Sequence, residues 1–263
     1  MEKVLRLENG GKIVGKLSEV ADSRGLILLV HGFAGNIDGP GGTSYKKIVR
    51  LLNERNFDVF RFNFRFTDKS LKDFEKMTIA GEISDLGYII RKFSKRYKNI
   101  GILGESLGGV ISVLAYGKEI KVLVLWYPTI DITENLGKTF DTEDARRELE
   151  EKGYVSGIKH SIGVKYRVGI RFISESKKTV AYNSLRQITA PTLIISPDGD
   201  TLVRFGQSAK AIKLIRSKDK RLITIKDSDH AWWKTGRRKR DWNAERLAMK
   251  ETVEWFDRYM PKN

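Results

Sequence analysis

The sequence predicts an α/β protein: a doubly wound, mostly parallel sheet with an N-terminal hairpin and an inserted segment. Three observations support this class. Short apolar runs alternate with longer segments whose apolar residues recur at helical spacing. Several runs, such as 26–30 and 122–127, lack a polar face, which is typical of parallel strands buried on both sides. The alternation breaks in one long stretch, residues 131–185.

Composition narrows the class of protein. The 263 residues are 40% hydrophobic and 31% charged, which is typical of a globular chain and not of a disordered one. The absence of cysteine excludes a disulfide framework, a thiolate metal site and cysteine catalysis. The start of the sequence lacks a secretory signal, and no apolar run approaches membrane-spanning length. We therefore expect a cytoplasmic protein with no membrane span.

The first half of the chain supplies the hairpin and four core strands. Two short strands, 4–7 and 13–17, are joined at Asn9-Gly10-Gly11, a hairpin signal. Apolar runs then predict core strands, and helical spacing of apolar residues predicts the helices between them. The expected strands are 26–30, 57–64, 100–103 and 122–127, with helices from residue 43 or 44, over 79–97 and over 110–116.

The second half begins with the interruption. Residues 131–185 mix a charged helix-like piece, 143–152, with glycines and scattered aromatic residues, and the segment is too long for a simple loop. We expect it to be an inserted cap, and 1–130 with 186–263 to be the core. The alternation then resumes, with strands expected at 192–196 and 222–225 and helices at 205–216 and 244–259.

A glycine-flanked serine lies between the strand 100–103 and the helix 110–116. In Gly104-Glu105-Ser106-Leu107-Gly108-Gly109, the two glycines next but one to Ser106 permit a very tight turn. A side chain at either position would collide with the neighbouring strand or helix. The following helix directs its backbone N–H groups toward the serine. This pattern indicates a nucleophile elbow, although a glycine-rich turn with an incidental serine would look similar.

The chain contains three histidines that could act as a base. His230 follows the last expected strand, at the carboxyl edge of the sheet, where active sites of open α/β sheets lie. His31 ends a buried strand, and we expect it to be structural; His160 lies in the expected cap.

The acid of the triad should follow the strand before the last one, 192–196, and both Asp198 and Asp200 do so. Either could instead cap a turn.

Backbone N–H groups could stabilise an oxyanion above Ser106. The loop after the strand 26–30 supplies Phe33, and Gly32 lets that backbone approach closely. Leu107 supplies the second donor. The glycines at 39–42 could alternatively bind phosphate, but the lysine and Ser/Thr of a Walker motif are absent at the required spacing.

Together these motifs resemble the α/β-hydrolase superfamily, and most of all its monoacylglycerol lipases, cinnamoyl or feruloyl esterases and related small carboxylesterases. The resemblance rests on 31–35, the elbow, Asp200-Thr201-Leu202-Val203 and Asp229-His230, and it covers about Leu26 to Tyr259. It implies a triad of Ser106, Asp200 and His230, favours Asp200 over Asp198, and implies an oxyanion hole at Phe33 and Leu107. One departure is the stretch 63–68, where the family often has a glycine-rich turn, so the nearby pocket is expected to differ.

These expectations define a serine esterase that cleaves a small-molecule carboxylic ester through an acyl-enzyme, with no metal or organic cofactor. An aminopeptidase-like or thioesterase activity would use the same triad.

A polyanion-binding protein is the third hypothesis. The net charge is +16, from 49 Lys and Arg against 33 Asp and Glu, and basic residues at 234–240 lie beside Trp232, Trp233 and Trp242. No nucleic-acid motif accompanies them, so we expect no specific nucleic-acid partner. The oligomeric state does not follow from the sequence.

The cap should determine the substrate. Its apolar residues could form an inner face for an apolar or aromatic acyl group, with Tyr166 and Phe172 in contact with substrate. The other expected inner-face residues are Tyr154, Ile158, Ile162, Ile170 and Ile173.

Overall fold

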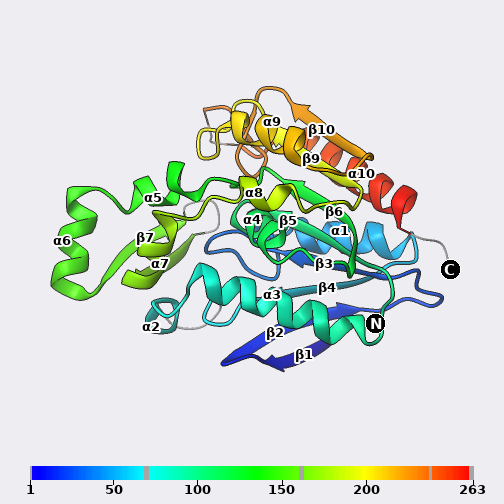
Figure 1. Cartoon of the computed structure of the whole chain (residues 1–263), viewed down its shortest axis with the longest axis horizontal. Coiled ribbons are helices and arrows are strands. Elements are labelled where there is room, and N and C mark those ends of the chain that lie inside the picture. The colour runs from blue at the N-terminus through cyan, green and yellow to red at the C-terminus, as the bar shows by residue number, and fades with distance from the viewer. Residues whose placement is uncertain (1, 68–70, 160–162, 237–238, 261–263) are drawn as a thin grey trace.

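Eight strands form one sheet in the order β1-β2-β4-β3-β5-β6-β9-β10 (Figure 1). The computed structural model describes residues 2–67, 71–159, 163–236 and 239–260. From β4 to β10 the neighbouring strands are parallel, whereas β1 pairs with β2, and β2 with β4, in antiparallel fashion. The predicted hairpin and mostly parallel sheet are confirmed. The strands are β1 (Glu2–Glu8), β2 (Lys12–Ser18), β3 (Leu26–Val30), β4 (Asp58–Asn63), β5 (Ile100–Glu105), β6 (Ile120–Trp126), β9 (Thr192–Pro197) and β10 (Lys220–Ile225).

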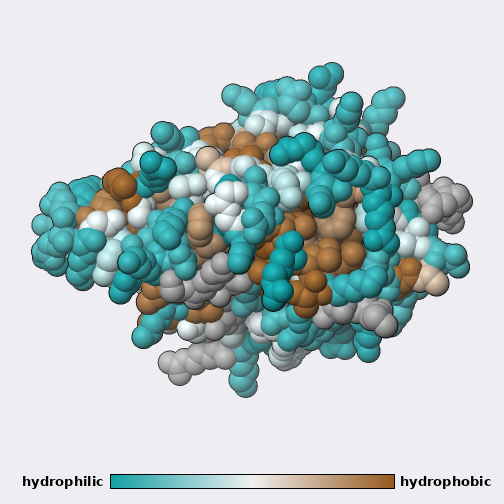
Figure 2. All heavy atoms as spheres, turned by 90° about the horizontal axis from the view of Figure 1, so that it is seen from below, coloured by the Kyte–Doolittle hydropathy of each residue, from teal (hydrophilic) through white to brown (hydrophobic). Residues whose placement is uncertain are grey.

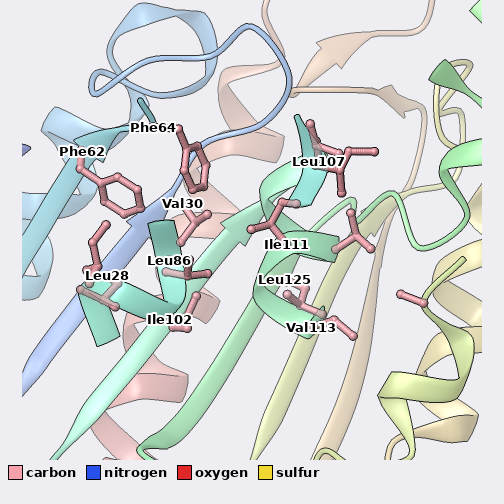
Figure 3. Packing of buried hydrophobic residues seen from close by; sticks show 14 of the residues in the cluster. Leu28, Val30, Phe62, Phe64, Leu86, Ile102, Leu107, Ile111, Val113 and Leu125 are labelled. Carbon is pink, nitrogen blue, oxygen red and sulfur yellow. The ribbon is translucent and has the colours of Figure 1, made fainter. Parts of the chain in front are cut away.

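Helices cover both faces of this sheet, because alternate residues of each central strand point to opposite sides. In β3, Ile27 and Leu29 join the core under one set of helices, while Leu28 and Val30 join the core under the other. Figure 3 shows Leu28 and Val30 on the side of Leu86. One face carries α1 (Ser44–Asn53) and α10 (Trp242–Tyr259); the other carries α3 (Ile79–Ser94), α4 (Leu107–Leu114) and α9 (Phe205–Leu214).

Several helices begin or end at other residues than predicted. Local hydrogen bonds and backbone conformation set these bounds, whereas the prediction used only the spacing of apolar residues. The helix predicted over 79–97 ends at Ser94, where the chain tightens and Arg96 N–H donates to the Phe93 carbonyl, three residues back. The helix predicted over 205–216 ends at Leu214, since Ile215 is already extended. The last helix begins at Trp242, two residues earlier than predicted, where the Asp241 side chain accepts from the N–H of Ala244.

The stretch between β6 and β9 builds elements outside the main sheet, and Figure 1 shows most of them at the left end of the molecule. The predicted helix is α6 (Glu143–Lys152). An antiparallel hairpin follows, which the sequence analysis did not predict; Gly157 interrupts the alternation in its first strand. The other elements are η2 (Ile132–Glu134), α5 (Leu136–Thr139), β7 (Tyr154–Lys159), β8 (Val164–Gly169), α7 (Ile170–Ser176) and α8 (Tyr182–Leu185).

Residues from all along this stretch, among them Ile132, Phe172 and Leu185, belong to the same buried cluster as residues of α3 and α4. The division into a core and a cap at 131–185 therefore stays a prediction. The remaining short elements are η1 (Pro40–Gly42), α2 (Leu71–Phe74), β11 (Ser228–Asp229) and β12 (Trp233–Lys234).

The surface is mostly hydrophilic on the face seen in Figure 2, with apolar side chains gathered near its middle. This is the side on which Figure 1 shows the edge strand β1, whose Val4 is 57% exposed. Within the described ranges, no helix has both the length and the apolar character needed to cross a membrane.

Candidate active site

Ser106 occupies the turn between β5 and α4 with a backbone that few residues adopt. Its φ is 53° and its ψ is −119°, a strained conformation for a residue with a side chain. Three backbone hydrogen bonds hold it there. Its N–H donates to the Trp126 carbonyl at 2.9 Å, and its carbonyl accepts from Gly109 at 3.0 Å and from Thr129 at 3.1 Å. The surrounding strands and helix thus impose the strain and fix the direction of the hydroxyl.

The two glycines that flank Ser106 are required sterically, as the sequence predicted. A Cβ at residue 104 would lie 2.5 Å from Ser112 Oγ and 2.7 Å from the Gly108 carbonyl oxygen. At Gly108 it would lie 2.3 Å from the carbonyl oxygen of Val30. Neither contact can relax without moving β3 or α4, so the elbow needs glycine at both positions.

The imidazole of His230 connects Ser106 to Asp200. Nδ1 lies 2.8 Å from Asp200 Oδ2, and Nε2 lies 3.1 Å from Ser106 Oγ. Since a carboxylate only accepts, the proton of the neutral ring belongs on Nδ1, which leaves Nε2 to accept from the serine hydroxyl. Three residues that are far apart in the sequence thus form a continuous hydrogen-bonded chain.

Asp200, and not Asp198, reaches the imidazole. Its Oδ1 accepts from the N–H groups of Leu202, at 2.9 Å, and Val203, at 2.7 Å, which turns Oδ2 toward His230. Asp198 is exposed, and its Oδ1 accepts from Asp227 N–H at 2.9 Å. Asp198 therefore stabilises a turn, the alternative that the sequence left open for either aspartate.

The loop after β3 passes close to Ser106 and holds the peptide group between Gly32 and Phe33 in a fixed orientation. The Gly32 carbonyl accepts from Gly35 N–H at 2.9 Å and from His31 Nδ1 at 2.9 Å. In a trans peptide the N–H points away from the carbonyl, so the Phe33 N–H points to the opposite side. A Cβ at residue 32 would lie 2.9 Å from Ser106 Cβ, so this loop approaches the serine closely.

His31 has the structural position expected for it. It is 1% exposed, and Phe64 N–H donates to its Nε2 at 3.4 Å while its Nδ1 donates to the Gly32 carbonyl. The ring is therefore a fixed neutral tautomer that holds the loop. His160 lies outside the described residues, as do Asp68, Ile162, Arg237 and Arg238.

A cavity of about 660 Å³ opens above Ser106 and His230. Its wall contains the aromatic residues Phe33, Tyr166 and Trp233 together with several aliphatic ones. Polar residues from η2, α5 and the link between them also line the cavity. They include Glu134, Asn135 and Thr139. The volume is within the range of small-ligand sites, which are mainly apolar with a few polar groups.

The two residues predicted to contact substrate have different positions. Tyr166 lines the cavity, and so does Ile158. Phe172 is fully buried behind the wall, where its ring stacks on Phe33 with centroids 5.4 Å apart, and it does not line the cavity. The expectation of direct contact by Phe172 is therefore corrected: its burial leaves it a supporting role. Ile170, also expected on the inner face, is 58% exposed and does not line the cavity.

Two polar residues at the site were missed by the sequence analysis. Thr129 Oγ1 lies 3.5 Å from Ser106 Oγ, and Thr129 lines the cavity. Glu105 is 3% exposed and also lines it. A signal existed for Glu105, because it is a charged residue at the end of an otherwise apolar strand. Thr129 has no such signal, since its position depends on how the chain turns after β6.

The stretch 63–67, where the sequence departs from the family pattern, does not contribute to the cavity wall. Arg65 forms an ion pair with Asp85 at 2.9 Å, and Phe64 is fully buried. The departure therefore affects the packing beside β4 and α3, and not the described wall of the pocket.

The described basic and aromatic residues near 232–242, which exclude Arg237 and Arg238, do not form one exposed surface. Trp232 is fully buried, and Arg240 is paired with Glu245 at 2.9 Å. Trp242 is 53% exposed, with Lys47 Nζ over its ring at 4.2 Å. This arrangement offers little of the stacked, cationic surface that single strands require. Among the described residues, no group of three or more His, Asp or Glu could hold a metal ion.

Comparisons with known proteins agree with this fold. A family model described as "alpha/beta hydrolase fold" matches residues 25–125. No curated protein sequence matches the chain significantly. Solved structures that resemble it include Est1E from Butyrivibrio proteoclasticus with ferulic acid bound, at 20% identity and a TM-score of 0.76, covering 97% of this chain and 98% of that one.

Two further neighbours have similar extents. The α/β hydrolase GrgF from Penicillium sp. sh18 is 14% identical, with a TM-score of 0.77 and 99% of each chain covered. A monoacylglycerol lipase from Paleococcus ferrophilus is 16% identical, with a TM-score of 0.65, covering 98% of this chain and 99% of that one. At these identities the likeness establishes the fold.

The sheet order, the elbow and the family model together define the α/β-hydrolase fold. The family model covers residues 25–125 of the chain, and the structural neighbours that share its fold include esterase- and lipase-like proteins.

Proposed function

We propose that this protein is a serine hydrolase that cleaves carboxylic esters through an acyl-enzyme on Ser106. The observation that carries the proposal is the hydrogen-bonded chain from Ser106 Oγ through His230 to Asp200, at 3.1 and 2.8 Å, which ends in a largely apolar cavity. Nucleophile, base and orienting acid within hydrogen-bond distance is the arrangement that activates a serine.

In the first half of the reaction, His230 Nε2 takes the proton of Ser106 as Oγ attacks the ester carbonyl carbon. Asp200 keeps the proton of the neutral ring on Nδ1 and stabilises the imidazolium that forms. The tetrahedral intermediate collapses when the imidazolium gives its proton to the alkoxide of the leaving alcohol. The acyl group then remains on Ser106 Oγ.

The developing oxyanion would be stabilised by the N–H groups of Phe33 and Leu107. The orientation of the Phe33 peptide, fixed through the Gly32 carbonyl, supports this role for Phe33. Leu107 begins α4, so its N–H lies among the unpaired donors at a helix N-terminus. Each such donor contributes roughly 10²–10³ in rate. Water, deprotonated by His230, then hydrolyses the acyl-enzyme.

The cavity wall supports an apolar or aromatic acyl group. Phe33, Tyr166 and Leu136 supply apolar surface beside Ser106. Ferulic acid, the ligand of the neighbour Est1E, is an aromatic acid, and the other neighbour is named a monoacylglycerol lipase. A small neutral ester with one apolar acyl arm therefore suits the site better than a polymeric or anionic substrate.

The experiment is a substrate panel. We expect turnover of p-nitrophenyl esters of graded acyl length and of a feruloyl ester, and much slower turnover of an aminoacyl amide and an acyl thioester. A burst of one equivalent of nitrophenol would report the acyl-enzyme. Faster turnover of the amide or thioester would replace the esterase proposal with an aminopeptidase-like or thioesterase activity on the same triad.

A further inference from the structure

Glu105 is a buried carboxylate beside the nucleophile that the mechanism above leaves without a role. It is 3% exposed, and no described residue forms an ion pair with it. Burying a carboxylate without a cation is costly unless donors satisfy it. Both of its oxygens are satisfied by single donors from two other parts of the site, and these donors indicate what the residue does.

One oxygen holds the oxyanion loop. Gly32 N–H donates to Glu105 Oε1 at 3.0 Å. Because the Gly32 carbonyl is held from the other side by His31 and Gly35, the residue is fixed at both of its peptide groups. The next N–H along the chain is that of Phe33, the proposed oxyanion donor. Glu105 therefore ties this donor to the strand that carries Ser106.

The other carboxylate oxygen of Glu105 is connected to His230 through Tyr127. Tyr127 Oη donates to Glu105 Oε2 at 2.9 Å, and the Tyr127 ring lies against the His230 ring, with centroids 4.6 Å apart and planes at 58°. Tyr127 is fully buried; burial, and then the charge of Glu105, raise its pKa well above the usual value, so the phenol remains a donor. A phenol polarised by a carboxylate presents an electron-rich face to an imidazolium.

We infer that Glu105 is a positioning residue for both halves of the site: it fixes the oxyanion loop through Gly32 and favours the imidazolium of His230 through Tyr127. The inference rests on the proposed function. Glu105 thus has two effects in this proposal: it fixes the position of the Phe33 N–H, and it stabilises the charged form of His230. These effects can be separated by substitution.

Other charged and titratable groups also surround His230, so the contribution of Glu105 must be measured against them. Asp200 binds Nδ1, and the Asp229 carboxylate accepts from the backbone N–H of His230. Arg240 donates to the carbonyl of Ala231, the next residue along the chain. Glu134 lines the same cavity. None of these groups changes in the variants below.

The test measures kcat and KM for a p-nitrophenyl ester from about pH 5 to about pH 9, with thermal unfolding of each variant. Glu105→Gln keeps an acceptor for Gly32 and removes the charge, so the acid limb of kcat/KM should move to lower pH by roughly half to one unit. Its kcat at high pH should fall less than about tenfold. Glu105→Ala also releases the loop, so kcat should fall about 10²-fold with little change in KM.

Tyr127→Phe tests the effect on His230 separately. It removes the hydroxyl that donates to Glu105 Oε2 and leaves the hydrogen bond from Gly32 N–H to Glu105 Oε1. Its acid limb should also move to lower pH, while its kcat should stay above that of Glu105→Ala. The matched control is Glu82→Gln, which changes another glutamate that is 3% exposed but lies on α3 and does not line the cavity. Its pH profile should coincide with that of the wild type.

Acid limbs of Glu105→Gln and Tyr127→Phe that coincide with the wild type would overturn the link to the base. A Glu105→Ala protein that folds and keeps its kcat would overturn the link to the oxyanion loop. A wild-type protein that lacks ester turnover or any acid limb would instead contradict the proposed function, so the two failures are distinguishable.

Discussion

The two sides of the cavity are held in different ways. On the side of the main sheet, Ser106, His230 and Asp200 are fixed by backbone hydrogen bonds and buried neighbours, and Asp200 is 8% exposed. On the opposite side, Ile158 and Tyr166 come from the small hairpin outside the main sheet, and Ile158 is 46% exposed. From this difference we expect substitutions on the sheet side to change the rate of the proposed chemistry, and substitutions on the hairpin to change the choice of substrate.

The largest effect is expected at the nucleophile. Ser106→Ala should lower kcat by on the order of 10⁴ or more, because no other described group occupies the position of Oγ beside His230 Nε2. The small side chain fits the same strained turn, so the circular dichroism spectrum should match that of the wild type. Activity within tenfold of the wild type would place the nucleophile elsewhere.

Asp200→Asn should cost roughly 10³–10⁴ in kcat, because an amide can donate to Nδ1 and so favour the wrong tautomer of His230. Asp198→Asn is the matched control, since its Oδ1 accepts from a backbone N–H and an asparagine oxygen can do the same. We expect its kcat within about threefold of the wild type. A larger loss at residue 198 than at residue 200 would reverse the assignment.

On the side of the main sheet, the sequence predicted individual residues of the site. For the opposite wall of the cavity, it predicted only an apolar character, from the composition of the segment 131–185. Ser106, Phe33 and His230 follow apolar strands whose parallel pairing brings their ends to one edge, so chain order alone locates them. Choosing Asp200 over Asp198 required the family resemblance, because both follow β9. Phe172 was misplaced because an apolar residue in a segment of irregular pattern gives no signal of whether it faces a cavity or the core.

Phe172→Ala tests the supporting role assigned to that residue. The ring is fully buried and packs on Phe33 and Phe140, so its removal should lower the free energy of unfolding by about 3–5 kcal/mol. Denaturant unfolding measures this loss. A stable variant with a changed preference for acyl length would mean that Phe172 contacts substrate after all.

Substitutions on the hairpin should change selectivity more than rate. Tyr166→Ala and Ile158→Ala enlarge the cavity wall, so the ratio of kcat/KM between long and short acyl esters should change by about threefold to tenfold. Ile170→Ala is the control, because Ile170 lies in α7 of the same segment, is 58% exposed and does not line the cavity. An unchanged ratio in both hairpin variants would remove the proposed role of this wall in selectivity.

The smallest effect concerns stability away from the cavity. Burial raises the pKa of Glu82 well above its usual value, and the charges of Asp85 and Glu175 add to this. The folded protein therefore keeps a proton that the unfolded chain releases above its ordinary pKa of 4.5. The stabilising contribution is complete below that pH and is lost as the pH rises toward the folded pKa.

Glu82→Gln imitates the protonated side chain at every pH. The Tm of the variant relative to the wild type should therefore increase from about pH 4 to about pH 7. A Tm difference that is constant over this range would mean that Glu82 does not hold its proton in the folded protein.

The most direct test of the proposed chemistry is covalent labelling with a fluorophosphonate, followed by intact-mass measurement and peptide mapping. One adduct per chain should form on Ser106 of the wild type, none should form on Ser106→Ala, and labelling of Asp200→Asn should be much slower because its imidazole is misoriented. An adduct on another residue, or equal labelling of Ser106→Ala, would contradict the assignment of Ser106 as the nucleophile.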